Sequence, residues 1–254
     1  MKIAVITGAS SGIGKEFVRQ LNLKENFDEI WVIARRVDRL ENLKDEVGEK
    51  IRPIGLDLTN DECLEKYKEL LKNENPTVAV LVNAGGYGKF EAFTNLTLEE
   101  QIGMIDLNVK ALTSMTYLTL PYMEKGTKVY QIGSLSSFQP VPYIGVYGAT
   151  KAYVLSFTRA INAELKNKGI KMMAVCPGWV KTEFFDTAVV DDRVITYYNQ
   201  FFTPEQVVTR AIKDMSKGKD VSVCGFMIRA QVLLTKLLPH RLVMNIWLKQ
   251  QKKK

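Results

Sequence analysis

Histidine is nearly missing from this chain of 254 residues, whose single copy is His240 near the C-terminus. Ser-His-Asp hydrolysis, acid–base chemistry on imidazole and multi-histidine zinc sites all depend on histidine. One histidine in a basic tail excludes these classes, and we expect no metal site. Any acid–base chemistry must fall to Tyr, Lys, Asp, Glu or Cys.

Cysteine is scarce as well, since the chain holds only Cys63, Cys176 and Cys224. They are odd in number and lack C-x-x-C spacing, so we interpret them as buried fillers in a reducing compartment. The chain enters an apolar segment at Ile3, which leaves no room for the ~7–15 apolar residues of a secretory signal. These features predict a cytoplasmic protein.

Repeats, Pro/Gly/Ser-rich linkers and long apolar runs are also lacking, and no run reaches the ~20 residues needed to span a bilayer. The net charge of +7 is concentrated in the tail, where six basic residues and no acidic one lie from Lys236 to the end. Nucleic-acid binding usually needs a basic face interleaved with aromatics or a recognisable module, which the body of the chain lacks. The sequence predicts one large domain and no nucleic-acid partner.

Short runs rich in β-branched residues alternate with helical stretches along most of the chain. The runs lack clean polar alternation, which is typical of strands buried on both faces. This alternation predicts right-handed βαβ units and an α/β fold: a single doubly wound Rossmann domain over 1–225, with a seven-stranded parallel sheet flanked by helices, and a C-terminal helical extension over 226–254. The predicted strands are Ile3–Thr7, Glu29–Ala34, Ile51–Leu56, Val78–Val82, Lys128–Ile132, Lys171–Cys176 and Asp220–Cys224. The predicted helices are Lys15–Leu23, Asp38–Val47, Asp61–Lys72, Leu98–Met123 and Tyr147–Lys168.

A glycine-rich loop follows the first predicted strand, where Thr7–Gly14 reads Thr-Gly-Ala-Ser-Ser-Gly-Ile-Gly. Glycines allow a tight turn and close approach of a phosphate, and the start of the next helix attracts its charge. The spacing is G-x-x-x-G-x-G rather than G-x-G-x-x-G. Glycines alone would fit a structural turn, but a position between strand and helix favours nucleotide binding.

Two arginines follow the second predicted strand, because Ala34 is followed by Arg35 and Arg36. An NAD-preferring fold of this type usually carries an acid here for the ribose 2′-hydroxyl, whereas arginine accommodates a 2′-phosphate. A solvated basic turn is the alternative. Beside the glycine loop, the pair predicts NADP(H) as the cofactor.

Tyr147 and Lys151 lie four residues apart on a predicted helix and therefore on one face. A neighbouring ammonium favours the phenolate, which would bring the pKa of Tyr147 from ~10 toward the working pH. A surface contact is the alternative. Ser134 follows the fifth predicted strand, at the sheet edge where such folds bind ligands, and its hydroxyl could bond a substrate oxygen.

With these motifs the chain resembles the classical short-chain dehydrogenases/reductases from Lys2 to about Asp214, in particular their hydroxysteroid-dehydrogenase-like and ketoacyl-reductase-like members. The likeness rests on Thr7–Gly14, Asp57, Asn83-Ala84-Gly85, Asn108, Ser134, Tyr147 with Lys151, and Pro177-Gly178. It implies that Ser134 polarises the substrate carbonyl and that Tyr147 passes it a proton as hydride arrives from the nicotinamide. It further implies that Lys151 lowers the pKa of Tyr147 and binds the nicotinamide ribose, and that Asn108 holds a water linking Lys151 to solvent.

The resemblance also implies a cofactor set. Asp57 would meet the adenine amino group, with Leu58 beside it. Gly86 departs from the pattern as an extra glycine, which we interpret as loosening its loop without removing a contact. Family members usually associate through the helices that carry Asn108 and Tyr147, so a homodimer or homotetramer is expected. The implied cofactor-binding residues are Gly8, Ser10, Ser11, Gly12, Ile13, Gly14, Arg35, Arg36, Asp57, Leu58, Asn83, Ala84, Gly85, Tyr147, Lys151, Pro177, Gly178, Val180 and Thr182.

Aromatic residues gather between positions 179 and 203, where this family places its substrate lid. An apolar pocket there would suit a bulky hydrophobic ketone such as a steroid, bile acid or long acyl chain, although packing of the lid onto the core is the alternative. The basic, Leu-rich tail beyond Gly225 covers the pocket or a subunit interface, which we favour, or lies on an anionic membrane surface as a peripheral contact. The candidate substrate residues are Tyr87, Ser136, Phe138, Tyr143, Trp179, Phe184 and Tyr197.

The sequence therefore predicts an NADP(H)-dependent oxidoreductase acting on CH–OH groups, a carbonyl reductase or hydroxysteroid or bile-acid dehydrogenase with Tyr147 as acid and base. A 3-ketoacyl thioester reductase is the alternative within the class. A nucleotide-sugar epimerase or dehydratase usually needs a longer C-terminal substrate domain. A non-catalytic nucleotide-binding protein would commonly have lost the tyrosine or the lysine.

Overall fold

Seven parallel strands form the frame of the protein in a computed structural model that describes residues 1–253. Their order across the sheet is β3-β2-β1-β4-β5-β6-β9, and every neighbouring pair is parallel. The order reverses between β1 and β4, which is the kind of switch point where such sheets bind ligands. The strands are β1 (Lys2–Thr7), β2 (Glu29–Ala34), β3 (Ile51–Gly55), β4 (Thr77–Asn83), β5 (Met123–Ile132), β6 (Lys171–Val175) and β9 (Val221–Ser222).

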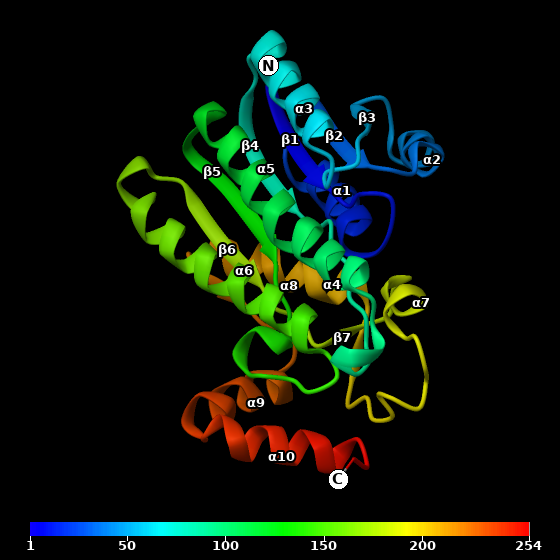
Figure 1. Cartoon of the computed structure of the whole chain (residues 1–254). Helices are drawn as coiled ribbons and strands as arrows, with labels where there is room; N and C mark the ends of the chain where they lie inside the picture. The colour runs from blue at the N-terminus through cyan, green and yellow to red at the C-terminus, as the bar shows by residue number, and fades with distance from the viewer. Residues whose placement is uncertain (254) are drawn as a thin grey trace.

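Helices cover both faces of this sheet, which is why its central strands β1 and β4 are mostly buried and apolar. Alternate residues of β1 point to opposite faces: Ala4 and Ile6 join one apolar cluster, and Ile3 and Val5 join the other. Helices α1, α2 and α8 pack into the first cluster, and α3, α5 and α6 into the second; the second group lies in front of the sheet in Figure 1. The helices are α1 (Gly12–Lys24), α2 (Val37–Val47), α3 (Asp61–Glu74), α4 (Leu98–Ile105), α5 (Leu112–Thr119), α6 (Gly145–Glu164) and α8 (Pro204–Ser216).

The predicted fold class is confirmed, but one predicted helix was wrong in part. The segment Leu98–Met123 is not one helix: α4 gives way to a π-helical turn, η2 (Asp106–Ala111), then to α5 and to a short 3-10 turn, η3 (Leu120–Tyr122). Pro121 lacks the N–H that would continue α5, and Met123 already belongs to β5. The predicted last strand, Asp220–Cys224, shortens to the two residues of β9.

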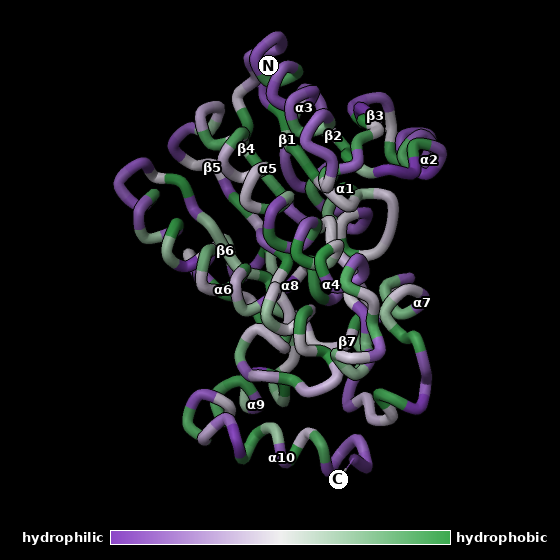
Figure 2. The backbone as a smooth tube through the Cα atoms, viewed as in Figure 1, coloured by the Kyte–Doolittle hydropathy of each residue, from purple (hydrophilic) through white to green (hydrophobic). Residues whose placement is uncertain are grey.

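The chain after β6 builds one end of the molecule. Strand β7 (Trp179–Val180) pairs with β8 (Phe201–Phe202), and the short helix α7 (Phe184–Ala188) lies between them in sequence. Helices α9 (Phe226–Leu237) and α10 (His240–Gln250) lie side by side beyond the sheet (Figure 1), with mixed hydrophobic and hydrophilic residues (Figure 2). Across residues 1–253, no helix is long and apolar enough to cross a membrane.

Candidate active site

A cavity of about 840 Å³ lies at the carboxyl ends of the strands. Residues that follow β1 through β6 line it, because parallel strands all present their carboxyl ends at the same sheet edge. The segment after β7 and the two C-terminal helices close its far side. The cavity therefore joins the predicted nucleotide loop to the predicted substrate lid.

The glycine loop between β1 and α1 forms one end of the cavity. Gly8 has a φ of +64°, and a Cβ placed there would lie 2.6 Å from the backbone nitrogen of Gly85, so the close approach of the two loops requires glycine. The Thr7 hydroxyl accepts hydrogen bonds from the backbone N–H groups of Ala84 and Gly85 at 3.1 and 3.2 Å. These bonds hold the loops after β1 and β4 together around the crevice.

Arg36 reaches across this loop. Its guanidinium donates to the hydroxyls of Ser10 and Ser11, both at 3.2 Å, and to a carboxylate oxygen of Glu183 at 3.1 Å. Arg39 donates to the same carboxylate at 2.6 Å, and the two arginines, Arg39 first, hold the pKa of Glu183 below its usual range. Glu183 was missed by sequence reasoning, since it lies 147 residues from Arg36 in the chain.

Arg35 is more loosely held than Arg36. Its guanidinium lies 3.9 Å from a carboxylate oxygen of Asp57, and about three-quarters of its side chain is exposed. Asp57 accepts hydrogen bonds from the backbone and the hydroxyl of Thr59; these bonds and Arg35 outweigh the effect of burial and lower the pKa of Asp57. Both arginines and Asp57 line the cavity.

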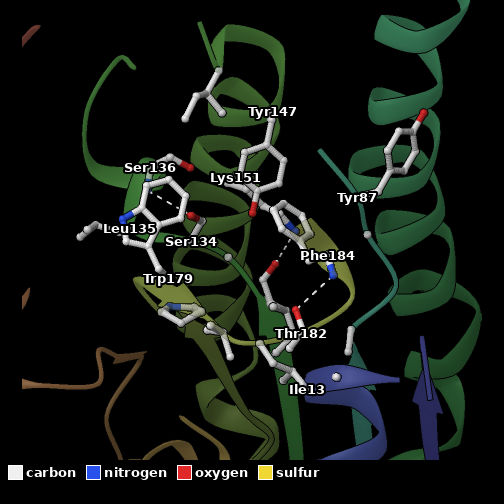
Figure 3. A pocket seen from close by; sticks show the side chains of 18 of the residues that line it. Ile13, Tyr87, Ser134, Leu135, Ser136, Tyr147, Lys151, Trp179, Thr182 and Phe184 are labelled. Carbon is white, nitrogen blue, oxygen red and sulfur yellow. Dashed lines mark hydrogen bonds between the residues drawn. The ribbon is translucent and has the colours of Figure 1, made fainter. Parts of the chain in front are cut away.

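Ser134, Tyr147 and Lys151 meet in the middle of the cavity (Figure 3). Ser134 follows β5 and caps the short turn η4 (Leu135–Phe138), while Tyr147 and Lys151 come from successive turns of α6. The Tyr147 ring contacts those of Phe184 and Phe90, with centroids 5.4 and 6.3 Å apart. Three polar groups thus converge beside an aromatic wall.

The pKa values of this pair differ from the expectation that Lys151 makes the phenol more acidic. Burial raises the pKa of Tyr147 to about 12, against a smaller lowering effect of the Ser134 hydroxyl. Burial also lowers the pKa of Lys151 to about 8. The Lys151 ammonium donates to the backbone oxygen of Ile132 at 2.8 Å and lies 5.6 Å from the Tyr147 ring centroid. The direction for Tyr147 is thus opposite to the expected acidification, and its largest cause is the burial of the phenol.

Asn108 lies behind Lys151 in the π-helical turn η2 and is fully buried. Its carboxamide accepts from the backbone N–H of Tyr87 at 3.1 Å and donates to the Tyr87 carbonyl at 2.9 Å and to the Thr150 hydroxyl at 3.0 Å. Such π-turns are frequent at functional sites, and this one directs Asn108 toward the loop after β4.

Gly86 is more than an extra glycine. A Cβ at this position would lie 2.9 Å from Asn108 Oδ1 and 3.3 Å from Lys151 Nζ. Besides the loosening of the loop expected from the sequence, the missing side chain of Gly86 therefore leaves room for both groups.

The cavity includes most of the predicted site residues and leaves four of them out. Asn108 does not line the cavity, although the preceding residues Asp106 and Leu107 do. Asn83 turns into the core, where its amide donates to Thr116 and Gln131. Phe138 packs against the main core, with the Lys236 ammonium 5.5 Å from the centroid of its ring. The Lys253 ammonium lies 5.4 Å from the centroid of the Tyr143 ring. The predicted lining residues present are Gly8, Ser10, Ser11, Gly12, Ile13, Gly14, Arg35, Arg36, Asp57, Leu58, Ala84, Gly85, Tyr87, Ser134, Ser136, Tyr147, Lys151, Pro177, Gly178, Trp179, Val180, Thr182, Phe184 and Tyr197.

Residues of the C-terminal helices also line the cavity. The sequence alone did not decide whether this tail covers the pocket, covers a subunit interface or lies on a membrane. The Trp247 indole donates to the Pro142 carbonyl at 3.1 Å, and the Gln251 side chain accepts from the backbone of Thr196 and Tyr197. These bonds fasten the tail to the loop before α6 and to the lid, so the tail is part of the pocket wall. The lining residues from the tail are Gln231, Leu234, Thr235, Leu238, Val243, Ile246, Trp247 and Gln250.

Known proteins share this sequence pattern and architecture. Residues 2–192 match the profile of the short chain dehydrogenase family. The very-long-chain 3-oxoacyl-CoA reductase of Bos taurus is 34% identical over 190 residues, covering 71% of this chain and 60% of that protein. The serine 3-dehydrogenase of Agrobacterium fabrum is 32% identical over 185 residues, covering 71% and 72%. A short-chain dehydrogenase from Sphingobium yanoikuyae in complex with NADPH has a TM-score of 0.77 at 28% identity, covering 88% of this chain and 87% of that one.

Proposed function

Because this chain belongs to the short chain dehydrogenase family, we propose that it interconverts a ketone and a secondary alcohol with NADP(H). The observation that carries this proposal is a single cavity, lined at one end by the glycine loop, in the middle by Ser134, Tyr147 and Lys151, and beyond them by the aromatic lid. Such a cavity suits a dinucleotide and a carbonyl compound held side by side. A bound nicotinamide supplies the hydride for reduction and accepts it in oxidation.

The residues at the loop fit a dinucleotide phosphate. The Ser11 hydroxyl faces Arg36 and does not cap α1, so the first backbone N–H groups of this helix remain for an anion. Arg36 is fixed by two serine hydroxyls beside the same loop, and Arg35 lies next to it. We therefore favour NADP(H) over NAD(H), with Arg36 as the main cation for the 2′-phosphate.

Tyr147 would donate the proton of its Oη to the carbonyl oxygen during reduction and take it back during oxidation. A buried phenol with a pKa of about 12 keeps its proton at neutral pH, as a proton donor must. Ser134 lies beside it, and the Ser136 Oγ is buried without a hydrogen-bond partner among residues 1–253. Ser134 and Ser136 would thus orient the substrate oxygen, while Lys151 would restore the proton to Tyr147.

The substrate end of the cavity supports a bulky apolar carbonyl compound. Its walls come from Trp179 and Phe184 of the lid and from Leu238 and Trp247 of the tail. A hydroxysteroid or bile acid suits this shape. The similarity to the Bos taurus 3-oxoacyl-CoA reductase favours a 3-ketoacyl thioester as the second candidate.

Tyr147→Phe tests the proposal. Loss of general acid catalysis should lower turnover at least ~10²-fold and leave NADPH affinity near wild type. Tyr122→Phe is a matched control, since Tyr122 belongs to η3 and does not line the cavity. Retained turnover in Tyr147→Phe would remove the proposed acid. A panel of ketosteroids and acetoacetyl thioesters, followed by NADPH absorbance, separates the two candidates.

We also propose that the protein self-associates through α4, α5 and α6, as a homodimer or homotetramer. Exposed apolar side chains on this side of the molecule support the proposal: Ile102 and Ile105 on α4, Tyr117 on α5 and Tyr153 on α6. Sedimentation of the wild type and of Tyr117→Glu would test it, because a charge in the interface should shift the protein toward monomer.

A further inference from the structure

Helix α9 buries one side and leaves a wholly apolar side exposed. Its inner positions Ile228, Val232 and Thr235 are buried. Its outer positions follow helical spacing on one face and are Phe226, Met227, Ala230, Leu233, Leu234 and Leu237. The exposed fractions of Phe226, Leu237 and Leu233 are 76%, 72% and 60%. We call these six residues the outer face of α9; scattered apolar residues need no explanation, but a contiguous face does.

Positive charge borders this face. Arg229 and Lys236 are exposed on α9, and Arg241 and Lys249 are exposed on the neighbouring α10. No acidic residue follows Asp220 in the sequence. An apolar helix face whose charged neighbours on α9 and α10 are all basic complements a surface that is apolar inside and anionic outside. The surface of a lipid bilayer with acidic headgroups has this character.

The outer face also adjoins the cavity. Leu234 lies on this face and lines the cavity, although its exposed fraction is 55%. Ile246 of α10 likewise lines the cavity and is 44% exposed. The cavity therefore reaches the surface beside the outer face of α9. An apolar molecule can pass from this face into the cavity with little contact with water.

We propose that the outer face of α9, with Leu242 and Ile246 of α10, docks on an anionic lipid bilayer, and that the apolar substrate enters the cavity from the lipid. A second copy fits this face less well, because a two-fold axis would bring the basic borders together with no acidic partner in the tail. The substrate route rests on the proposed function, whereas the docking itself does not.

Vesicle sedimentation tests the docking. The full chain is mixed with vesicles of phosphatidylcholine alone or of equal parts phosphatidylcholine and phosphatidylglycerol. We expect binding to the anionic vesicles that weakens as salt rises. The double variant Leu233→Glu with Leu237→Glu should bind roughly tenfold to a hundredfold more weakly, as expected from two lost apolar side chains. Leu23→Glu, which charges an 83% exposed leucine at the end of α1, should bind like wild type.

A second double variant, Arg229→Gln with Arg241→Gln, tests the contribution of the basic residues. It should weaken binding to anionic vesicles roughly tenfold or more. The proposal is overturned if wild type binds neither vesicle, or if the leucine variant binds as well as wild type. A third outcome also overturns it: the protein binds neither kind of vesicle, and the leucine variant changes the sedimentation of the protein without lipid. The outer face of α9 would then be a subunit interface. NADPH affinity and turnover of a water-soluble ketone, measured without lipid, report on the proposed function separately.

Discussion

Gly86→Ala should displace two residues to which we assign roles in proton transfer, Asn108 and Lys151, while leaving the frame of the protein intact. A Cβ at this position would lie 2.9 Å from Asn108 Oδ1 and 3.3 Å from Lys151 Nζ. The φ of Gly86 is not in the left-handed region, so alanine suits the backbone there. The effect of the substitution is therefore confined to these two contacts.

Asn108 and Lys151 cannot move away from an added methyl group without losing hydrogen bonds. Asn108 is fully buried and makes two hydrogen bonds with the backbone of Tyr87 and one with Thr150, while Lys151 is held by the carbonyl of Ile132. Overpacking of this kind costs about 1–3 kcal/mol, equivalent to a fall in Tm of about 2–10 °C. A displacement of about 1 Å at a catalytic group can cost ~10²-fold in rate. We expect turnover to fall about a hundredfold.

The assay compares kcat for NADPH-dependent ketone reduction, NADPH affinity and Tm. Gly145→Ala is the matched control, because it lies at the start of α6, has no atom within 4 Å of an added Cβ and has no left-handed φ. It should keep wild-type activity. Wild-type kcat and Tm in Gly86→Ala would refute the reasoning, since Asn108 and Lys151 would then not need their present positions.

Three further substitutions or conditions test the electrostatics of the chain. Glu183→Gln removes a carboxylate that would compete with the proposed 2′-phosphate for Arg36. NADPH should then bind a few-fold more tightly with NADH affinity unchanged, and equal changes for both nucleotides would contradict the competition. Because burial lowers the pKa of Lys151 to about 8, its ammonium is lost as pH rises through that value, and carbonyl reduction should slow above about pH 8; a flat profile up to about pH 9 would contradict this. Asp214→Ala removes a buried carboxylate that accepts from Arg210 and Ser222, and should lower the free energy of unfolding by about 2–3 kcal/mol, visible as a lower Tm.

Local signals account for what could be predicted. The run Val78–Val82 and the loop Thr7–Gly14 carry their own structure in residues that are adjacent in sequence, and β4 and the glycine loop lie where these patterns placed them. The Leu-rich composition of the tail likewise indicated the C-terminal helical extension, which is α9 and α10 in the structure. The frame and the cavity end that holds the glycine loop were therefore accessible from the sequence.

Contacts between distant segments account for what could not be predicted. Glu183 meets Arg36 only because the segment after β7 folds back across the glycine loop. Asn83 faces the buried Thr116 and Gln131, which depends on which way the end of β4 turns. Gly86 matters because α4, η2 and α6 bring Asn108 and Lys151 to one point. None of these contacts leaves a pattern in nearby residues.

The pKa values of Tyr147 and Lys151 have a shared cause in the burial of both groups and not in their helical spacing. Phe90 and Phe184 cover the phenol, and burial disfavours the charged form of both groups, raising one pKa to about 12 and lowering the other to about 8. A tyrosine that keeps its proton beside a lysine that can give one up near neutral pH is suited to donating a proton to a carbonyl oxygen, and the same pair takes the proton back when the alcohol is oxidised. Removing the Phe184 ring should admit water to the phenol and bring the pKa of Tyr147 back toward its ordinary value. The apolar wall would then set the proton chemistry as well as the choice of substrate.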